Sequence, residues 1–530
     1  MLPAAKGAQG IFYRKHNFSF PAHMNYGIYF IERILNFKEK RALVNGATGE
    51  ELTFGQIVRE VLSVAASLVG LGIRKGDLVA VVSENRSEVL TTIIAAMCAG
   101  ASVTLINSAY TAGELLHTTN ITNPKYMFLS PTAYKKHHET LKKLTFVSKF
   151  CLFGDSSSKE IISYNDLANK EADFTNFCDY YGRVEVALVL YSSGTTGLPK
   201  GAKVTHANLI AVSQQHDFCP DKSALTLSPL CNTFGLIITL KTLVNGKMVI
   251  LLSRFKEKQF LETIQKYKVQ SLMAAPPLVV LMSKSSLVDN FDLRSVEIIY
   301  SGGAPLDESV IKELEKRLPN LRVLQGYGST ETTGPITEET VADRRQGSIG
   351  KAVQGIVIKV VDIESRNVLG PGEPGEVCVN GVILFDGYIG KPKSEYFDDD
   401  GFYRTGDIAY YDQDGYFFII GRLKELIKYK AWQVSPAEIE GVLLKHPAVK
   451  DAGVIGAPDP LAGELPTAFV VKQPGAEVTE NDIIEFVSLE VSPWKRLRGG
   501  VRFVSEIPKT GSGKILRRVL RDMLKAKSKI

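Results

Sequence analysis

Cysteine is scarce in this chain of 530 residues, and the six that occur follow no recognisable pattern. None lies in a CxxC pair or at Cys/His ligand spacing, so the cysteines indicate neither a disulfide framework nor a zinc site. Thiols scattered in this way are typical of a reducing compartment. They are Cys98, Cys151, Cys178, Cys219, Cys231 and Cys378.

Long hydrophobic runs are also missing. The first 16 residues lack the apolar core of a secretory signal. No charge occurs between Glu88 and Glu114, but Thr, Ser and Asn side chains interrupt the stretch and Gly100 breaks it. This pattern predicts a buried helix followed by a buried strand rather than a membrane span, which needs ~20 predominantly apolar residues.

Charge is unevenly distributed along the chain. The net charge is +6, yet residues 492–530 alone hold twelve Lys and Arg against Glu506 and Asp522. Such a cationic end suits an anionic partner, such as phosphate, nucleic acid or an acidic surface, although a solvated helix face has the same composition. The apolar fraction of 45% and the chain length predict an ordinary globular protein with two or more domains.

The order of apolar segments predicts an α/β protein. From about residue 52 to 350, short strand-like runs alternate with helical patterns, which favours a largely parallel sheet with helices on its faces. Between about 350 and 420, short strands punctuated by Gly, Asp and Pro predict an antiparallel sheet or barrel, and mixed α/β follows. The clearest expected strands are 186–191, 247–252, 296–303 and 321–328, and the clearest helices are 53–72, 260–268 and 308–318.

A loop rich in small and hydroxyl residues follows the expected strand 186–191. It reads Tyr191-Ser-Ser-Gly-Thr-Thr-Gly-Leu-Pro-Lys-Gly201. Its backbone N–H groups, its hydroxyls and the charge of Lys200 suit an anion such as a phosphate, although a Ser/Thr/Gly run can also be a simple turn. It is not a Walker A loop, because no Gly precedes the Lys and no Ser or Thr follows it.

This loop resembles the signature of the adenylate-forming enzymes, which include acyl-CoA synthetases, 4-coumarate–CoA ligases and beetle luciferases. The resemblance implies an α/β fold with a large N-terminal region of parallel-sheet subdomains, a small β-barrel-like subdomain and a small mobile α+β C-terminal domain. It implies an adenylation domain at 1–423 and a lid domain at 424–530. The other matching motifs, in the family's order, are SGGAPL (301–306), QGYGSTET (325–332), YRTGD (403–407), GRLKELIKYKAWQVSPAEIE (421–440) and PKTGSGKILRR (508–518).

The implied activity is that of an ATP-dependent carboxylic acid–CoA ligase that uses Mg²⁺ and forms an acyl-AMP before the thioester. A luciferase-like oxygenase, an adenylating enzyme with another acceptor, and a non-catalytic nucleotide-binding or nucleic-acid-binding protein remain alternatives. Neither half-reaction needs an enzyme nucleophile, so cations and oriented N–H groups should carry catalysis. The residues that match the family's catalytic positions are Lys514 for adenylation, Lys428 and Gln433 for the second half-reaction, Thr330 for the α-phosphate and Glu331 for Mg²⁺.

The resemblance also implies the contacts with the nucleotide and with CoA. These are, for the phosphates, Ser192, Ser193, Gly194, Thr195, Thr196, Gly197 and Lys200; for adenine, Gln325, Gly326 and Tyr327 on one side and Gly302, Gly303 and Ala304 on the other; for ribose, Asp407 and Arg422; at the hinge of the lid, Lys424; and for CoA, Arg254, Lys430 and Ala431.

The chain departs from the family pattern in three places. Asn232 stands where the relatives have a histidine near the reacting carboxylate, and an amide cannot accept a proton at neutral pH. Gly421 replaces an aspartate at the hinge, and Ala431 replaces a glycine where pantetheine should pass. The acid pocket implied by the resemblance is apolar, as an aryl or a medium- to long-chain aliphatic acid requires. It comprises Asn232, Phe234, Ile238, Ser301, Gly328 and Pro335.

The last three residues, Ser528-Lys529-Ile530, differ only at the final position from the peroxisomal address Ser-Lys-Leu. We therefore expect a peroxisomal protein that an import receptor recognises through this tripeptide, with the cytoplasm as the alternative location.

Overall fold

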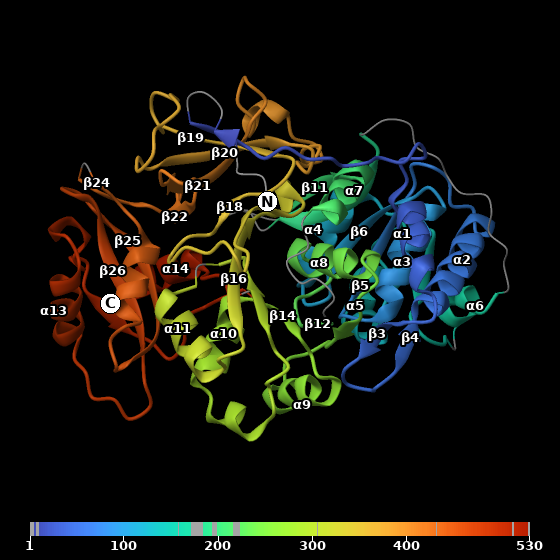
Figure 1. The fold of residues 1–530 in the computed structure, drawn as a ribbon, viewed down its shortest axis with the longest axis horizontal. Coiled ribbons are helices and arrows are strands. Elements are labelled where there is room, and N and C mark those ends of the chain that lie inside the picture. Colours follow the sequence, from blue (N-terminus) through green and yellow to red (C-terminus); the bar gives the residue numbers. More distant parts are fainter. Residues whose placement is uncertain are drawn as a thin grey trace.

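Two mostly parallel sheets, with a layer of helices between them, make up the larger part of the computed structural model (Figure 1). The structure describes residues 5–6, 10–156, 158, 160–170, 184–192, 199–215, 223–304, 306–430, 432–510 and 513–527. The predicted helix 53–72 is present as α2 (Phe54–Gly70), and Thr53 and Gln56 form the capping box that begins it.

The seven-stranded sheet has the order β11-β10-β6-β5-β7-β8-β9, and only β11 is antiparallel to its neighbour. Its strands are β5 (Leu78–Ser83), β6 (Ser102–Asn107), β7 (Tyr126–Leu129), β8 (Lys149–Leu152), β9 (Ile161–Ser163), β10 (Val186–Ser192) and β11 (Lys200–Thr205).

The nine-stranded sheet has the order β18-β17-β16-β15-β14-β12-β13-β3-β4, with a parallel centre from β16 to β3 and antiparallel strands at both edges. Its strands are β3 (Arg41–Asn45), β4 (Glu51–Thr53), β12 (Ala224–Thr226), β13 (Val249–Leu251), β14 (Ser271–Ala274), β15 (Ile298–Ser301), β16 (Arg322–Gly328), β17 (Pro335–Glu338) and β18 (Lys351–Ala352).

Helices cover both faces of both sheets. Val79 and Val81 of β5 face the helices between the sheets, whereas Ala80 and Val82 face α4 and α5 on the outside, because successive side chains of a strand point to opposite faces. This double burial explains why the central strands are unbroken apolar runs in the sequence. The inner helices are α1 (Tyr26–Ile34), α2 (Phe54–Gly70), α3 (Ser87–Cys98), α7 (His206–Gln214) and α8 (Thr233–Val244), and the outer ones are α4 (Ala112–Thr122), α5 (Pro131–Leu141), α9 (Glu257–Tyr267), α10 (Pro276–Lys284) and α11 (Glu308–Arg317), while the short α6 (Tyr164–Ala168) packs on α2.

The charge-free stretch after Glu88 forms the predicted buried helix and strand, α3 and β6. Within the described ranges, no helix is long and apolar enough to cross a membrane.

An antiparallel sheet of six strands occupies the place of the barrel-like subdomain expected between residues 350 and 420. Its order is β1-β2-β19-β20-β21-β22, so two strands from the very start of the chain complete a sheet whose other strands lie far along the sequence. No sequence pattern indicated this pairing. The strands are β1 (Ala5–Lys6), β2 (Ile11–Tyr13), β19 (Ile356–Val361), β20 (Gly375–Gly381), β21 (Tyr403–Tyr411) and β22 (Phe417–Arg422).

The C-terminal part has its own sheet and its own hydrophobic core, and it forms the left side of Figure 1. The predicted limit between residues 423 and 424 falls between β22 and the first strand of this sheet, and it stays a prediction. The elements are β23 (Ile427–Tyr429), β24 (Trp432–Val434), α12 (Pro436–Leu443), β25 (Val449–Asp459), β26 (Gly463–Lys472), α13 (Glu480–Glu490), β27 (Val501–Phe503) and α14 (Arg517–Lys527). Short 3₁₀ helices complete the fold: η1 (Leu35–Phe37), η2 (Ser286–Asn290), η3 (Thr330–Thr332), η4 (Lys393–Glu395) and η5 (Pro493–Lys495).

Candidate active site

A cavity of 1180 Å³ lies at the carboxyl ends of the central strands of the nine-stranded sheet. Residues that directly follow β12, β14, β15 and β16 line it, as expected for an open parallel sheet, where ligands bind beyond the strand ends. The antiparallel sheet contributes Asp407 and Arg422 to the wall, and the segment before α14 contributes Lys514. Three parts of the chain therefore meet around one cavity.

Most of the described residues that the sequence predicted to belong to the site line this cavity. They are Ser192, Lys200, Asn232, Phe234, Ile238, Arg254, Gly302, Gly303, Gly326, Gly328, Thr330, Glu331, Pro335, Asp407, Arg422, Lys424 and Lys514. Ser301, Ala304, Gln325 and Tyr327 are next to lining residues in the sequence but do not line the cavity themselves. Lys428 and Lys430 do not line it either. Ser193, Gly194, Thr195, Thr196, Gly197, Ala431, the side chain of Gln433 and the tripeptide 528–530 lie outside the described residues.

Asp407, on β21, is the centre of a polar cluster on the cavity wall. Its Oδ2 accepts a 2.6 Å hydrogen bond from the Tyr327 hydroxyl, and its Oδ1 lies 3.1 Å from Arg422 Nε. Burial raises the pKa of this carboxyl, and the neighbouring Arg422 opposes the shift. Each carboxylate oxygen can accept more than one hydrogen bond, so a pair of ligand hydroxyls can still bind here.

Lys514 reaches the cavity from the segment that precedes α14. Its N–H donates to Thr510 Oγ1 at 3.1 Å, and its carbonyl accepts from the Thr510 N–H at 2.8 Å. Three residues later, Arg517 pairs with Glu425 at 3.0 Å and with Glu440 at 2.7 Å, and all three side chains are largely buried. This ion cluster fixes the segment that carries Lys514 to the start of the C-terminal part.

Glu331, in η3, is a buried carboxylate at the cavity wall. Its Oε1 accepts a hydrogen bond from the Tyr388 hydroxyl at 2.5 Å. The hydroxyl of the neighbouring residue Thr330 accepts a hydrogen bond from the Thr233 hydroxyl, with the two oxygens 3.1 Å apart. In the described part of the chain no three His, Cys, Asp or Glu side chains gather as metal ligands, so a divalent ion here would depend on Glu331 and on ligand oxygens. That donor set suits Mg²⁺, which commonly uses one or two carboxylates together with phosphates and water.

Lys428 and Gln433 lie opposite each other in the β23–β24 ladder, away from the cavity. Lys428 and Lys430 are both exposed. The C-terminal part therefore presents Lys514 to the cavity and keeps the β23–β24 hairpin outside it. The predicted role of this hairpin in a second half-reaction requires the C-terminal part to turn.

The end of the cavity beneath α8 is apolar. Asn232 precedes α8 without capping it through its side chain, and the Phe234 ring stacks 6.3 Å from the Tyr300 ring. A Cβ on Gly235 would lie 2.5 Å from the Pro229 carbonyl oxygen, so this tight entry to the helix requires glycine. The other apolar lining residues here are Leu227, Ile237, Ile238, Met273, Leu278 and Leu281.

Sequence reasoning missed the residues that support the predicted ones. Tyr388 contacts Glu331, Glu425 and Arg517 anchor the Lys514 segment, and Thr233 contacts Thr330. Three of these residues lay close to predicted positions: Thr233 follows Asn232, Glu425 follows Lys424, and Arg517 lies within the last motif. Tyr388, in the segment between β20 and η4, belongs to no motif and carried no signal.

The comparisons with known proteins agree with this geometry. The sequence models described as "AMP-binding enzyme" and "AMP-binding enzyme C-terminal domain" match residues 30–389 and 438–514. A luciferin 4-monooxygenase of Nipponoluciola cruciata is 39% identical over 91% of each chain. The peroxisomal OPC-8:0-CoA ligase 1 of Arabidopsis thaliana is 36% identical over 92% of this chain and 91% of its own.

Among solved structures, ATP-bound MatB from Rhodopseudomonas palustris has a TM-score of 0.86 at 28% identity, covering 95% of this chain and 99% of its own. The apo form of the same protein has a TM-score of 0.76 with the same coverage. Over the whole chain, the structure is thus more similar to the ATP-bound form than to the apo form. On its sequence models, its relatives and its fold, the chain belongs to the adenylate-forming superfamily of AMP-binding enzymes.

Proposed function

We propose that the protein is an ATP-dependent carboxylic acid–CoA ligase. The observation that carries the proposal is the position of Lys514, which lines the same cavity as Asp407, Glu331 and Asn232 although it lies far from all three in the sequence. A cation at this junction can draw together the acid and the α-phosphate of ATP and stabilise the charge of the transition state.

Different lining residues bind different parts of an acyl-adenylate. Asp407 and Arg422 bind the ribose, and Lys200 contributes charge at the phosphate end. Glu331 would hold Mg²⁺, which would supply positive charge to the phosphates. Lys514 lies at the bond that forms between the carboxylate and phosphorus, with pyrophosphate as the leaving group. CoA thiolate then attacks the acyl carbon and AMP leaves, with Lys428, Lys430, Gln433 and Ala431 brought to the cavity by a turn of the lid at Lys424.

The apolar end of the cavity supports an aryl acid of the 4-coumarate type or a medium- to long-chain fatty acid. Asn232 at its mouth offers an amide donor to the carboxylate in place of an imidazole. The name of the OPC-8:0-CoA ligase relative and the C-terminal Ser528-Lys529-Ile530 support a peroxisomal location and recognition by an import receptor.

The second candidate is a luciferase-like oxygenase, which the luciferin 4-monooxygenase relatives favour. Both candidates form an acyl-adenylate and differ in the fate of that intermediate. The deciding experiment supplies a panel of carboxylic acids with ATP, Mg²⁺ and CoA, scores thioesters by mass and records O₂ consumption. CoA-dependent thioester without O₂ uptake supports the ligase, and adenylate with O₂ uptake but no thioester contradicts it.

Asn232→His is expected to keep the rate of thioester formation within about threefold of the wild type. The reason is that the Asn232 side chain does not cap α8, so its replacement removes no helix-stabilising hydrogen bond. The measurement is kcat and KM for the best acid of the panel. Complete inactivation would mean that the acid pocket is shaped around the smaller amide.

The adenylation rate is expected to fall at alkaline pH, below the ordinary lysine value of about 10.4. Burial lowers the pKa of Lys514, and Arg422 adds to the shift, while Glu425 and Asp407 oppose it. Because a lysine loses its charge as pH rises through its pKa, the lowered pKa moves the loss of activity to lower pH. In Lys514→Arg the decline should move to higher pH, since a guanidinium stays charged. An identical pH profile of pyrophosphate release in both proteins would contradict this assignment.

A further inference from the structure

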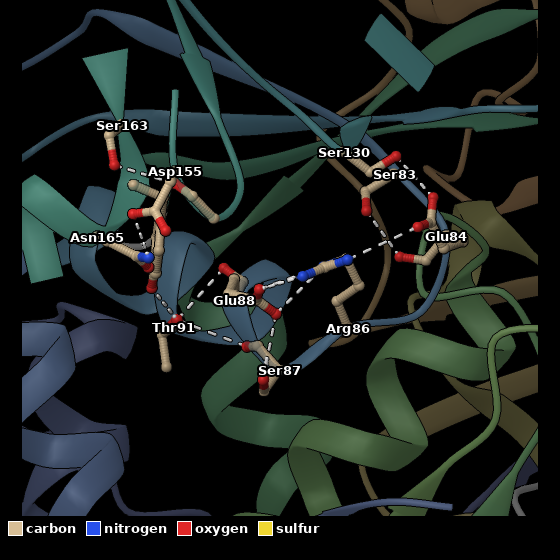
Figure 2. A network of polar contacts seen from close by, with 12 residues as sticks. Ser83, Glu84, Arg86, Ser87, Glu88, Thr91, Ser130, Asp155, Ser163 and Asn165 are labelled. Carbon is tan, nitrogen blue, oxygen red and sulfur yellow. Dashed lines mark hydrogen bonds and ion pairs between the residues drawn. The ribbon is translucent and has the colours of Figure 1, made fainter. Parts of the chain in front are cut away.

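Polar contacts on both sides fix the loop between β5 and α3 (Figure 2). Glu84 accepts a 2.6 Å hydrogen bond from Ser130 Oγ, and Arg86 Nη2 lies 2.5 Å from Glu88 Oε1. Arg86 Nη1 also lies 3.9 Å from Glu84. All of these partners belong to the seven-stranded sheet and its helices, so the loop is held in place on its own side of the molecule.

Asn85, between these anchors, reaches the other sheet. Its Nδ2 donates to the carbonyl oxygens of Ser228 at 3.1 Å and Leu252 at 3.2 Å, and its Oδ1 accepts from the Leu230 N–H at 2.8 Å. The residue is 8% exposed. One buried amide therefore uses both donors and an acceptor to join two loops of the nine-stranded sheet to a fixed point on the seven-stranded sheet.

Both loops border the cavity. The loop 227–232 supplies Asn232 to the lining, and the loop 252–255 supplies Arg254. The turn in the first loop is closed by the Asn232 N–H, which donates to the Pro229 carbonyl oxygen at 2.9 Å. Asn85 does not line the cavity, so any effect on the ligands passes through these loops.

We propose that Asn85 is a positioning residue that sets the spacing of the loops 227–232 and 252–255, and through them the shape of the acid and CoA end of the cavity. The kinetic part of this inference rests on the proposed ligase function. The nucleotide end depends on Asp407 and Arg422, which belong to the antiparallel sheet and not to these loops. Loss of Asn85 should therefore act on the acid and CoA and spare ATP.

Asn85→Asp tests the inference, because aspartate keeps the acceptor for Leu230 but sets an oxygen against two carbonyl oxygens in place of the NH₂ group. We expect KM for the acid and for CoA to rise about tenfold, with KM for ATP changed less than about twofold. We also expect faster hydrogen–deuterium exchange in peptides that cover 227–232 and 252–255. Asn85→Ala, which buries no charge, serves the same test if the aspartate variant does not fold.

Arg86→Gln is the matched control, since it removes the ion pairs of the same loop and leaves the three hydrogen bonds of Asn85. It should lower the melting temperature without changing any KM or the exchange of the two loops. Unchanged exchange at both loops in the Asn85 variants, or an equal rise in the KM for ATP, would overturn the proposal and leave Asn85 as a stabilising residue only. Exchange is measured without substrates, so its outcome does not depend on whether the protein is a ligase.

Discussion

Lys514→Ala is expected to slow acyl-adenylate formation at least about a hundredfold while ATP still binds. Two unit charges ~4 Å apart at an effective dielectric of ~20 attract by about 4 kcal/mol, which corresponds to roughly a thousandfold in rate if the contact is made only in the transition state. No carboxylate of the described residues forms an ion pair with Lys514, so its charge remains for the reacting groups. The measurement is acid-dependent pyrophosphate release, with ATP affinity determined separately by equilibrium binding.

Lys509→Ala is the matched control for this variant. Lys509 belongs to the same basic segment but pairs with Asp451 at 2.7 Å, outside the cavity lining. Its loss should leave pyrophosphate release unchanged. Acyl-AMP supplied directly to Lys514→Ala should still yield thioester with CoA, because in the proposed mechanism that step uses the other face of the lid. Wild-type pyrophosphate release in Lys514→Ala would remove the central assignment.

Asp407→Asn is expected to raise the KM for ATP about ten- to a hundredfold with a smaller effect on kcat. The amide keeps the shape of the side chain but loses one acceptor oxygen and the charge that faces Arg422. Hydrogen bonds to a charged group each contribute about 1.5–3 kcal/mol, which is the range of this loss. The measurement is the KM for ATP at saturating acid.

Comparison of ATP with 2′,3′-dideoxy-ATP shows whether the loss concerns the ribose. The wild type should discriminate strongly between them, and Asp407→Asn should discriminate weakly, because the hydroxyls then have lost their partner. Asp412→Asn serves as control, since Asp412 pairs with Arg345 near the same hairpin but outside the cavity lining. If Asp407→Asn and the wild type discriminate equally between ATP and 2′,3′-dideoxy-ATP, residues other than Asp407 bind the ribose hydroxyls.

Several features were readable from local sequence alone. The start of α2 at Thr53 follows from a capping box formed with Gln56, and the strand–helix alternation follows from hydrophobic periodicity. The anion-binding character expected of the loop after β10 and the motifs around Asp407 and Lys514 were equally local. Such features depend on neighbours within a few residues, which is the range over which a sequence can be read directly.

Other features depend on which distant surfaces meet. Nothing near Tyr388 shows that its hydroxyl contacts Glu331, and nothing in the first 13 residues shows that β2 pairs with β19. Asn85 looks like an ordinary loop residue until the two sheets are placed side by side. Short sequence motifs thus identified the residue types that the proposed chemistry needs. Packing decided that Lys514, Asp407 and Asn232 meet around one cavity, because a contact between two remote segments leaves no periodic pattern in the sequence of either segment.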